Sequence, residues 1–205
     1  RRLDEVRAHG VPNYFGEQRF GHGGANVTRA RHLFESGETI RDRHLRGLLL
    51  SAARSWIFNA VLAARVRDGS WQQPQAGEVF MLDGSRSFFP ATAIDDVLRE
   101  RHARCDIHLT GPLWGRGALP TQGAVREREA AIAATEPVLC AGLEAAGLEQ
   151  ERRALRLIPK EMTADWTGDR VLRVAFSLPA GTYATVVLRA LAAYRDVSGP
   201  TPEGD

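Results

Sequence analysis

The stretch Val11-Pro12-Asn13-Tyr14-Phe15-Gly16-Glu17-Gln18-Arg19-Phe20-Gly21 combines three aromatic residues, two glycines, two amides and an arginine. This mixture is not typical of a helix face or a strand. Glycine lets the backbone approach a ligand closely or adopt a positive φ, and aromatic rings offer flat stacking surfaces. Asn13, Gln18 and Arg19 add directional hydrogen bonds, and arginine can bind phosphate or carboxylate through two N–H groups. The stretch is therefore either a ligand-binding turn or a tight, well-packed turn between core elements.

The charge of the chain is concentrated in the region that follows this stretch. The 205 residues are 43% hydrophobic, enough to bury a core in one domain or two small ones, and the formal net charge is only +2. Between Arg19 and Asp68, however, nine arginines stand against four carboxylates, a local net charge of +5. Such a block is typical of a phosphate-binding face, and a solvated helical surface is the alternative.

Several classes of protein do not fit the sequence. Cys105 and Cys140 stand alone, without a zinc-ligand pattern or a disulfide framework, which favours a reducing compartment and predicts no metal site. The apolar runs are shorter than the ~20 residues that a membrane span needs, and no secretory signal is visible. The chain opens without methionine in what is predicted to be the middle of a helix, so we expect a fragment of a longer protein.

Helices are predicted where apolar residues recur at helical spacing. A first helix ends before Gly10, and a second covers about Val27 to Ser36, with Asn26 as its N-cap and Gly37 as its stop. The longest predicted helix covers about Asp42 to Val66, and further helices are expected over residues 94–104, 124–146 with a break at Pro137, and 183–193. The apolar stripe of the longest helix is Leu49, Ala53, Trp56, Ile57, Ala60, Val61 and Ala64.

Fewer strands can be predicted. Residues 79–82 and 86–89 flank Asp83-Gly84 and indicate a hairpin, and residues 171–178 alternate as a strand does. The Gly- and Pro-rich residues 111–123 are predicted to be a loop. The tail from Val197 is rich in Pro, Gly and acids, and we expect it to be frayed.

Three blocks of this sequence resemble the TruD family of tRNA pseudouridine synthases, in family order and spacing, and residues 111–123 resemble it more weakly. The first block is Asn13-Tyr14-Phe15-Gly16 with Gln18-Arg19-Phe20-Gly21. The second is Ile40-Arg41-Asp42-Arg43-His44, followed by Leu50-Ser51-Ala52-Ala53-Arg54-Ser55 and Phe58-Asn59. The third is Leu178-Pro179-Ala180-Gly181-Thr182-Tyr183-Ala184-Thr185 with Val187-Leu188-Arg189.

The resemblance implies an α+β fold in which part of a pseudouridine-synthase catalytic domain is interrupted by a helix-rich α/β insertion domain. It assigns residues 1–21 and 159–205 to the catalytic domain and residues 22–158 to the insertion. It also implies cofactor-free isomerisation of a uridine in tRNA to pseudouridine, with tRNA as the partner, in the cytoplasm, and with no metal and no membrane.

The family's catalytic aspartate lies in a motif upstream of the first block, so we expect no catalytic nucleophile in this chain. Asp42, within Arg41-Asp42-Arg43-His44, superficially imitates that motif but follows the first block instead of preceding it. We interpret Asp42 as an acid at a helix N-terminus, where the helix dipole favours negative charge.

The resemblance also implies roles for particular residues. Gly181 and Thr182 are expected to place backbone N–H groups at a helix N-terminus, where they could bind phosphate. Arg189 is expected to support catalysis by pairing with the family's aspartate, or else to be an ordinary surface arginine. The implied substrate-pocket residues are Asn13, Phe15, Gly16, Gln18, Arg19, Gly181, Thr182 and Tyr183, and the implied tRNA-backbone contacts are Arg41, Arg43 and Arg46, whose alternative is a solvated face.

Two functions follow from this sequence. One is a tRNA pseudouridine synthase represented here without its nucleophile, and the other is a non-catalytic RNA-binding fragment. In either case, a strand and a helix near the C-terminus whose sheet partners are missing would leave apolar edges exposed, and we expect poor solubility or self-association.

Overall fold

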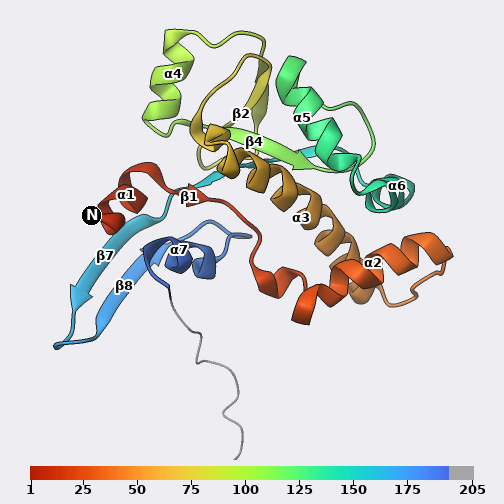
Figure 1. The fold of residues 1–205 in the computed structure, drawn as a ribbon, viewed down its shortest axis with the longest axis horizontal. Coiled ribbons are helices and arrows are strands. Elements are labelled where there is room, and N and C mark those ends of the chain that lie inside the picture. Colours follow the sequence, from red (N-terminus) through yellow and green to blue (C-terminus); the bar gives the residue numbers. More distant parts are fainter. Residues whose placement is uncertain (194–205) are drawn as a thin grey trace, which may run out of the picture.

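Helix α3 (Arg43–Arg67) is the central element of the fold in the computed structural model, which describes residues 1–193 (Figure 1). Asp42 is its N-cap, because the carboxylate accepts hydrogen bonds from the N–H groups of His44 (2.9 Å) and Leu45 (3.2 Å). Side-chain oxygens at this position satisfy donors that the first helical turn leaves unpaired. The predicted start and structural role of Asp42 are therefore confirmed. The expectation for the tail from Val197 falls outside the described residues.

Helix α3 is buried on two sides, not along one stripe. Leu49 and Ile57 pack into a helical cluster, whereas Phe58 and Leu62 pack against a sheet. The prediction for Trp56 was wrong, since its side chain is 37% exposed. Its ring packs edge-on against Phe20, and its indole N–H donates to Glu136 Oε1 at 2.7 Å. An indole has a polar N–H to satisfy, so helical spacing alone does not place it in the core.

The helical cluster joins α3 to α2 (Ala25–Ser36), α5 (Gly123–Ala133) and α6 (Pro137–Ala145). Pro137 begins α6, as the predicted break requires. The N-cap of α2 is Gly24, in the left-handed conformation (φ 81°), so the prediction for Asn26 was wrong. Helix α6 crosses α2 closely at Gly142, where a Cβ atom would overlap the ring of Phe34. A small residue is therefore required at this crossing.

An antiparallel four-stranded sheet covers the other side of α3, with strand order β3-β2-β4-β5. The predicted hairpin is confirmed, with Asp83-Gly84 at its turn. The loop predicted over residues 111–123 was partly wrong, because its first three residues belong to β4. Strand β4 lacks alternation since nearly all of it is buried, and β5 had no strand signal. The bounds are β2 (Glu78–Leu82), β3 (Phe88–Ala91), β4 (Ile107–Leu113) and β5 (Glu151–Ala154), with α4 (Asp96–Ala103) between β3 and β4.

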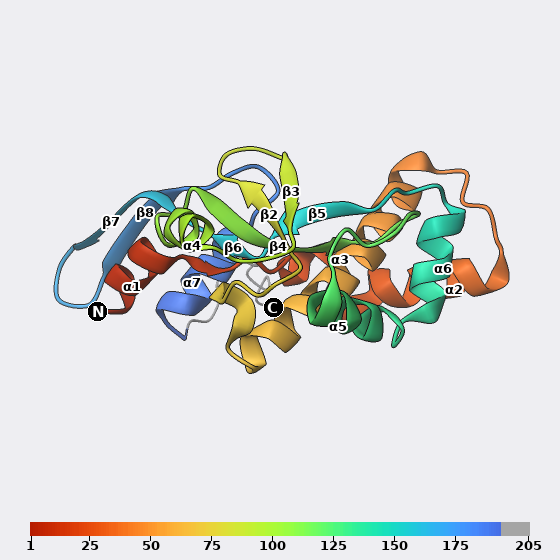
Figure 2. The same ribbon diagram turned by 90° about the horizontal axis from the view of Figure 1, so that it is seen from above.

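The remaining elements form a third cluster at one end of the molecule. In Figure 2 this end holds α1, α7, β7 and β8, and the opposite end holds α2 and α6. Its buried residues are Val6, Val11, Leu157, Met162 and Val187. The elements are α1 (Arg2–His9), β1 (Val11–Pro12), β6 (Arg156–Leu157), β7 (Lys160–Trp166), β8 (Leu172–Ser177) and α7 (Ala184–Leu191), with β1 paired to β6 and β7 to β8, both antiparallel.

The chain from Val11 to Phe15 connects this third cluster to the centre of the fold. Val11 pairs with Leu157, and the N–H of Asn13 then donates to the carbonyl of Leu155 at 2.8 Å. Phe15 ends this run against α3, where its ring meets Phe58 edge-on with centroids 5.5 Å apart. The aromatic and glycine-rich stretch is therefore fixed between strands β5 and β6 on one side and α3 on the other.

Helix α3 also has the length and apolar composition of a membrane span, alone among the helices of residues 1–193. Its composition has another explanation in the fold, because the helix supplies buried side chains to both the helical cluster and the sheet. A helix that is apolar on most sides is expected at the centre of a soluble core as well as in lipid.

Candidate functional site

A cavity of about 720 Å³ opens where the stretch 13–19 meets α3, β5, β6 and the segment 179–182. Residues far apart in the sequence share its wall, including Asn13, Phe15 and Arg19 from the first segment and Gly181 and Thr182 from the last. Cavities of this size are typical of small-molecule and cofactor sites. The structure thus brings five of the eight predicted pocket residues to one cavity.

Phe15 is held at this wall through its backbone. Its N–H donates to Asn59 Oδ1 at 2.9 Å, and its carbonyl accepts from Asn59 Nδ2 at 3.0 Å. One amide side chain therefore satisfies both polar groups of a single residue, which fixes the position of the ring relative to α3. Asn59 is a site residue to which the sequence reasoning assigned no role.

Arg153, on β5, packs its guanidinium over the ring of Phe15, 4.0 Å from the centroid. Its Nη2 donates to Asn13 Oδ1 (2.7 Å), and its Nη1 donates to the carbonyl of Gly181 (3.0 Å). Burial lowers the pKa of this guanidinium to about 10, with the nearby charge of Arg19 acting in the same direction. The side chain remains cationic at neutral pH. Sequence reasoning missed Arg153 because its partners lie 28 and 140 residues away.

Arg19 lies beside the same aromatic wall. Its Nε donates to the hydroxyl of Tyr183 at 2.8 Å, and its Nη1 donates to Ser51 Oγ at 3.0 Å. Its guanidinium carbon lies 5.9 Å from the centroid of Phe15 and 6.0 Å from that of Tyr183. These distances are within the range of cation–π attraction.

Of the four other arginines that line the cavity, three are held by contacts within the protein. Arg54 is bonded to Glu151 and to the carbonyls of residues 113, 114 and 149. Arg152 is buried against Glu129, with an Nη2–Oε1 distance of 2.7 Å. Arg156 donates to His108 and to the carbonyls of residues 102 and 107. These side chains join elements to one another and have few donors left for a ligand.

A polar chain runs along the opposite rim of the cavity. Arg156 Nε donates to His108 Nδ1 at 3.2 Å, so the other nitrogen, His108 Nε2, is the one that donates to Asp83 Oδ1 at 3.0 Å. Burial lowers the pKa of His108, and the hydrogen bond to Asp83 opposes that effect only in part. Lys160 Nζ holds the second oxygen of Asp83 at 3.3 Å. The carboxylate is thus fully engaged and is a weak base.

The other predicted pocket residues are arranged around Gly16. A Cβ atom on Gly16 would lie 2.8 Å from Cδ1 of Tyr183, so glycine is required for Tyr183 to pack here. Tyr183 meets Phe15 edge-on, with ring centroids 6.1 Å apart. Gln18 is exposed and its amide lies over Gly16. Gly16, Gln18 and Tyr183 do not line the cavity and instead lie directly behind its wall.

The helix N-terminus expected at Gly181 and Thr182 does not occur there. Helix α7 begins at Ala184 with Tyr183 as its N-cap. The N–H of Thr182 donates to the carbonyl of Pro179 (3.3 Å), as does its hydroxyl (2.7 Å), so a turn uses the N–H that was expected to bind phosphate. Gly181 has a left-handed φ of 81° and contributes its carbonyl to Arg153.

Arg189 lies on a separate cavity, of about 560 Å³, which shares Phe15 with the first. Its Nη2 is 2.9 Å from Glu17 Oε1, and the hydrogen bond from Arg189 lowers the pKa of that carboxyl. Arg189 is about half exposed and lies in the last turn of α7. The carboxylate that Arg189 contacts is therefore Glu17, and not the catalytic aspartate that the family resemblance implies.

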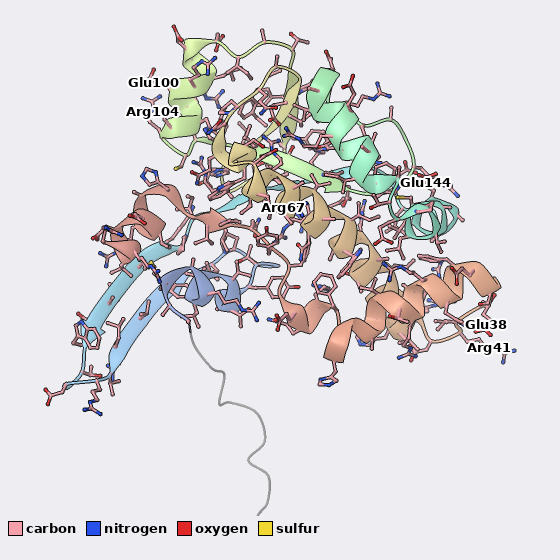
Figure 3. All side chains as sticks on the ribbon, in the orientation of Figure 1. Glu38, Arg41, Arg67, Glu100, Arg104 and Glu144 are labelled. Carbon is pink, nitrogen blue, oxygen red and sulfur yellow. The ribbon has the colours of Figure 1, made fainter. Side chains whose placement is uncertain are left out.

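The arginines predicted to contact tRNA, Arg41, Arg43 and Arg46, are all exposed. They lie in and just before the first turn of α3. Figure 3 places Arg41 beside Glu38 at the end of the molecule distant from β7 and β8. Ser51 is the residue of α3 that contacts Arg19 at the cavity. Arg43 lies eight residues before it, which is about 12 Å along the helix axis. These arginines therefore form a surface separate from the cavity.

Taken together, the fold and the cavity define an α+β protein with a cationic, aromatic-walled site suited to a flat and negatively charged ligand such as a nucleotide. Among residues 1–193, no group of three or more His, Cys, Asp and Glu is arranged to hold a metal ion. Stacking on an aromatic ring and charge-assisted hydrogen bonds from arginine are the chemistry by which proteins bind single-stranded nucleic acid.

Comparison with known proteins narrows this class to one family. The family model described as tRNA pseudouridine synthase D (TruD) matches residues 29–191. The chain is 48% identical over 190 residues to tRNA pseudouridine synthase D of Hydrogenovibrio crunogenus, covering 93% of this chain and 55% of that protein. It is 45% identical over 201 residues to the protein of the same name from Nitrosococcus oceani, covering 97% and 56%. The chain belongs to the TruD family of tRNA pseudouridine synthases.

A solved structure shows the same fold. The crystal structure of a protein assigned as tRNA pseudouridine synthase D from Methanosarcina mazei superposes with a TM-score of 0.72, at 17% identity, over 92% of this chain and 62% of that one. The predicted α+β class and the family resemblance are confirmed. The chain spans about half the length of the relatives that it matches.

Proposed function

We propose that the protein is a tRNA pseudouridine synthase, which isomerises a uridine in tRNA to pseudouridine without a cofactor. Family membership and the names of the relatives support this proposal. We further propose that it acts in the cytoplasm. The nucleophilic aspartate is proposed to lie outside residues 1–205, since Asp42 is occupied as the N-cap of α3.

The observation that carries the proposal is the cavity itself. Segments that are far apart in sequence meet around about 720 Å³ of space, and one wall is the ring of Phe15 with two arginines close to it. An enzyme that acts on a base must take that base out of its stack and hold it in a pocket. A flat ring with fixed cations beside it is suited to hold an extruded nucleotide.

Within this function, the predicted residues differ in how directly they contact the substrate. Asn13, Phe15, Arg19, Gly181 and Thr182 form the substrate pocket directly, whereas Gly16, Gln18 and Tyr183 support its wall from behind. Arg41, Arg43 and Arg46 contact the tRNA backbone away from the pocket. Arg189 supports catalysis only where the catalytic aspartate replaces Glu17 as its partner.

We propose the predicted domain division as well, with an insertion at 22–158 between catalytic-domain segments 1–21 and 159–205. The third buried cluster supports it, since four of its five members, Val6, Val11, Met162 and Val187, lie in the two outer segments. The fifth, Leu157, lies within two residues of the proposed boundary.

The test is pseudouridine formation in unmodified tRNA, measured for this chain and for a version that includes the coding sequence upstream of Arg1. We expect activity in the extended protein only. Activity of residues 1–205 alone would show that the nucleophile is in this chain and would bring Asp42 back into consideration. If neither protein is active but the extended one binds tRNA, the alternative of a non-catalytic RNA-binding protein would be favoured.

A further inference from the structure

We propose that Arg19 and Arg153 together bind one phosphate group of the RNA strand at the wall of the cavity formed by Phe15. The inference rests on the proposed function for the identity of the ligand as RNA. It assigns a specific contact to two residues, one of which, Arg153, no sequence motif had indicated.

Both arginines retain hydrogen-bond donors after their structural contacts are counted. An arginine side chain has five N–H donors. Arg153 uses three, for Gly181 and for the side chain and backbone of Asn13. Arg19 uses two, for Tyr183 and Ser51. Arg19 Nη2 makes none of these bonds and is not one of the buried unpartnered atoms of the described residues, so it is accessible. Arg153 keeps one unused N–H on each of Nη1 and Nη2.

The two guanidinium groups also lack a counter-charge. Within residues 1–193, neither forms an ion pair with a carboxylate. The carboxylates that line the cavity are already engaged, since Asp83 is held by His108 and Lys160 and Glu151 is held by Arg54. Two cations near one aromatic ring repel each other, and burial weakens the hydration that would offset this repulsion. A bound anion removes both costs.

Phosphate is the anion that the arrangement fits best. Arginine binds phosphate oxygens through paired N–H groups, and such charge-assisted bonds are stronger than neutral ones. Both guanidinium carbons lie close to the Phe15 ring, 4.0 Å (Arg153) and 5.9 Å (Arg19) from its centroid. The ring can support a base, while the phosphate of the same nucleotide is only one sugar away. Arg153 is also held rigidly by Asn13 and Gly181, so little side-chain freedom is lost on binding.

The first experiment measures tRNA affinity against salt concentration for the extended protein and its Arg19→Gln, Arg153→Gln and doubly substituted variants. Each lost phosphate contact reduces the slope of log K against log salt by about 0.7 to 0.9. We expect each single variant to show such a loss and the double variant to show little more, because both residues hold one phosphate. Arg99→Gln, an exposed arginine on α4, is the matched control and should leave the slope unchanged.

The second experiment identifies the anion by competition against tRNA. We expect uridine monophosphate to compete better than uridine for the unsubstituted protein and to lose this advantage in Arg153→Gln. Arg153→Lys keeps the charge and should retain most of the slope. If Arg153→Gln shows no cooperative thermal transition and is therefore unfolded, Arg19→Gln alone tests whether the site binds phosphate.

Unchanged slopes in Arg19→Gln and Arg153→Gln, or equal competition by uridine and its monophosphate, would overturn the phosphate site. The proposed function would survive that result if the unsubstituted protein still bound and modified tRNA. An extended protein that bound no tRNA would instead overturn both the function and the site.

Discussion

At the scale of single residues, two adjacent arginines on β5 have opposite roles. Both reach the wall of the cavity, but the side chain of Arg152 is buried and bonded to Glu129, whereas the guanidinium of Arg153 packs over the ring of Phe15. Successive side chains of a strand point to opposite faces, so neighbours in sequence can occupy unlike environments. The sequence cannot say which of the two contacts a ligand, because that depends on which face of β5 receives Glu129 from the distant helix α5. Together with the large sequence separation of its partners, this is why Arg153 could not be predicted.

Asn59 is expected to control the position of Phe15. Asn59→Ala removes both hydrogen bonds to the Phe15 backbone and leaves a half-buried N–H and carbonyl without partners. We expect the free energy of unfolding to fall by about 1–3 kcal/mol, and tRNA affinity to weaken as the ring loosens. Urea denaturation and a binding titration measure the two effects. Gln73→Ala, at an exposed position, is the control, and equal losses in both variants would refute the role of Asn59.

His102 should make stability depend on pH. Burial lowers its pKa to about 4, and the charges of Arg156, His108 and Arg65 add to the effect. The unfolded chain, with a pKa near 6.5, takes up a proton as the pH falls below about 6.5, while the folded protein does not. The contribution to stability is therefore complete above pH ~6.5 and is lost progressively down to pH ~4, by roughly 1–3 kcal/mol.

Urea denaturation at pH 7 and at pH 4.5 tests this expectation. His102→Phe preserves an aromatic ring beside Phe80, whose centroid lies 6.2 Å from that of His102. It should lose less stability on acidification than the unsubstituted protein. Some loss should remain, since burial also lowers the pKa of His108. Identical losses in the two proteins would exclude His102 as the titrating group.

At the scale of elements, the helices were predictable, whereas five of the eight strands of residues 1–193 were not. Helix α3 follows from its apolar spacing and from Asp42 before it. Strand β4 contains Gly111-Pro112, which reads as a loop, yet Gly111 is needed because a Cβ there would crowd Leu155 and Phe58. Strand β5 reads Glu-Arg-Arg-Ala, and its one buried side chain, Arg152, is paired with the distant Glu129 and bonded to Thr110. Alternation of apolar and polar residues identifies a strand only when one face is exposed to water. In β4 and β5 the side chains are instead surrounded by residues that are distant in the sequence.

A buried ion pair joins α3 to β2. Arg65 and Glu78 are 1% and 0% exposed, with an Nη2–Oε1 distance of 2.6 Å. Burial raises the pKa of Glu78, and the hydrogen bond from Arg65 opposes this. Glu78→Leu should destabilise the protein by about 3–5 kcal/mol, because it leaves a buried guanidinium without its counter-charge.

The double variant Arg65→Met with Glu78→Leu is the informative comparison. Replacing both charges by apolar side chains removes the unpaired charge, so most of the loss should be recovered. Denaturant midpoints of the three proteins measure this. A double variant no more stable than Glu78→Leu would indicate that Arg65 acts mainly through its hydrogen bond to the carbonyl of Ser70, at 2.8 Å.

At the scale of the whole molecule, the site exists because residues at both ends of the sequence meet beside α3. The identity of five cavity residues could be predicted from family resemblance, but their arrangement could not. The Val11–Leu157 pairing sets the register that brings Asn13 to Arg153. No local pattern specifies that pairing, because each of the two strands involved is only two residues long. The role expected for the Thr182 N–H was wrong for a local reason instead, since the turn at Pro179 uses that N–H.

The hairpin of β7 and β8 is expected to make this chain self-associate. The two strands pair only with each other among the described residues, which leaves an unpaired edge on each. Trp166 and Leu172 face each other in register near the tip and are 69% and 46% exposed, and Val171 beside them is 58% exposed. Unpaired edges next to exposed apolar side chains are templates for association.

Sedimentation velocity over a range of protein concentrations tests this expectation for residues 1–205. We expect the unsubstituted chain to shift to larger species as concentration rises, and Trp166→Arg with Leu172→Glu to shift much less. The substituted pair keeps a favourable cross-strand contact, so the hairpin should remain folded. Its position about 20 Å along β7 from Lys160 should leave the cavity intact. A chain that stays monomeric throughout would mean that the charged pair Asp165 and Arg173, next along the hairpin, already protects the edge.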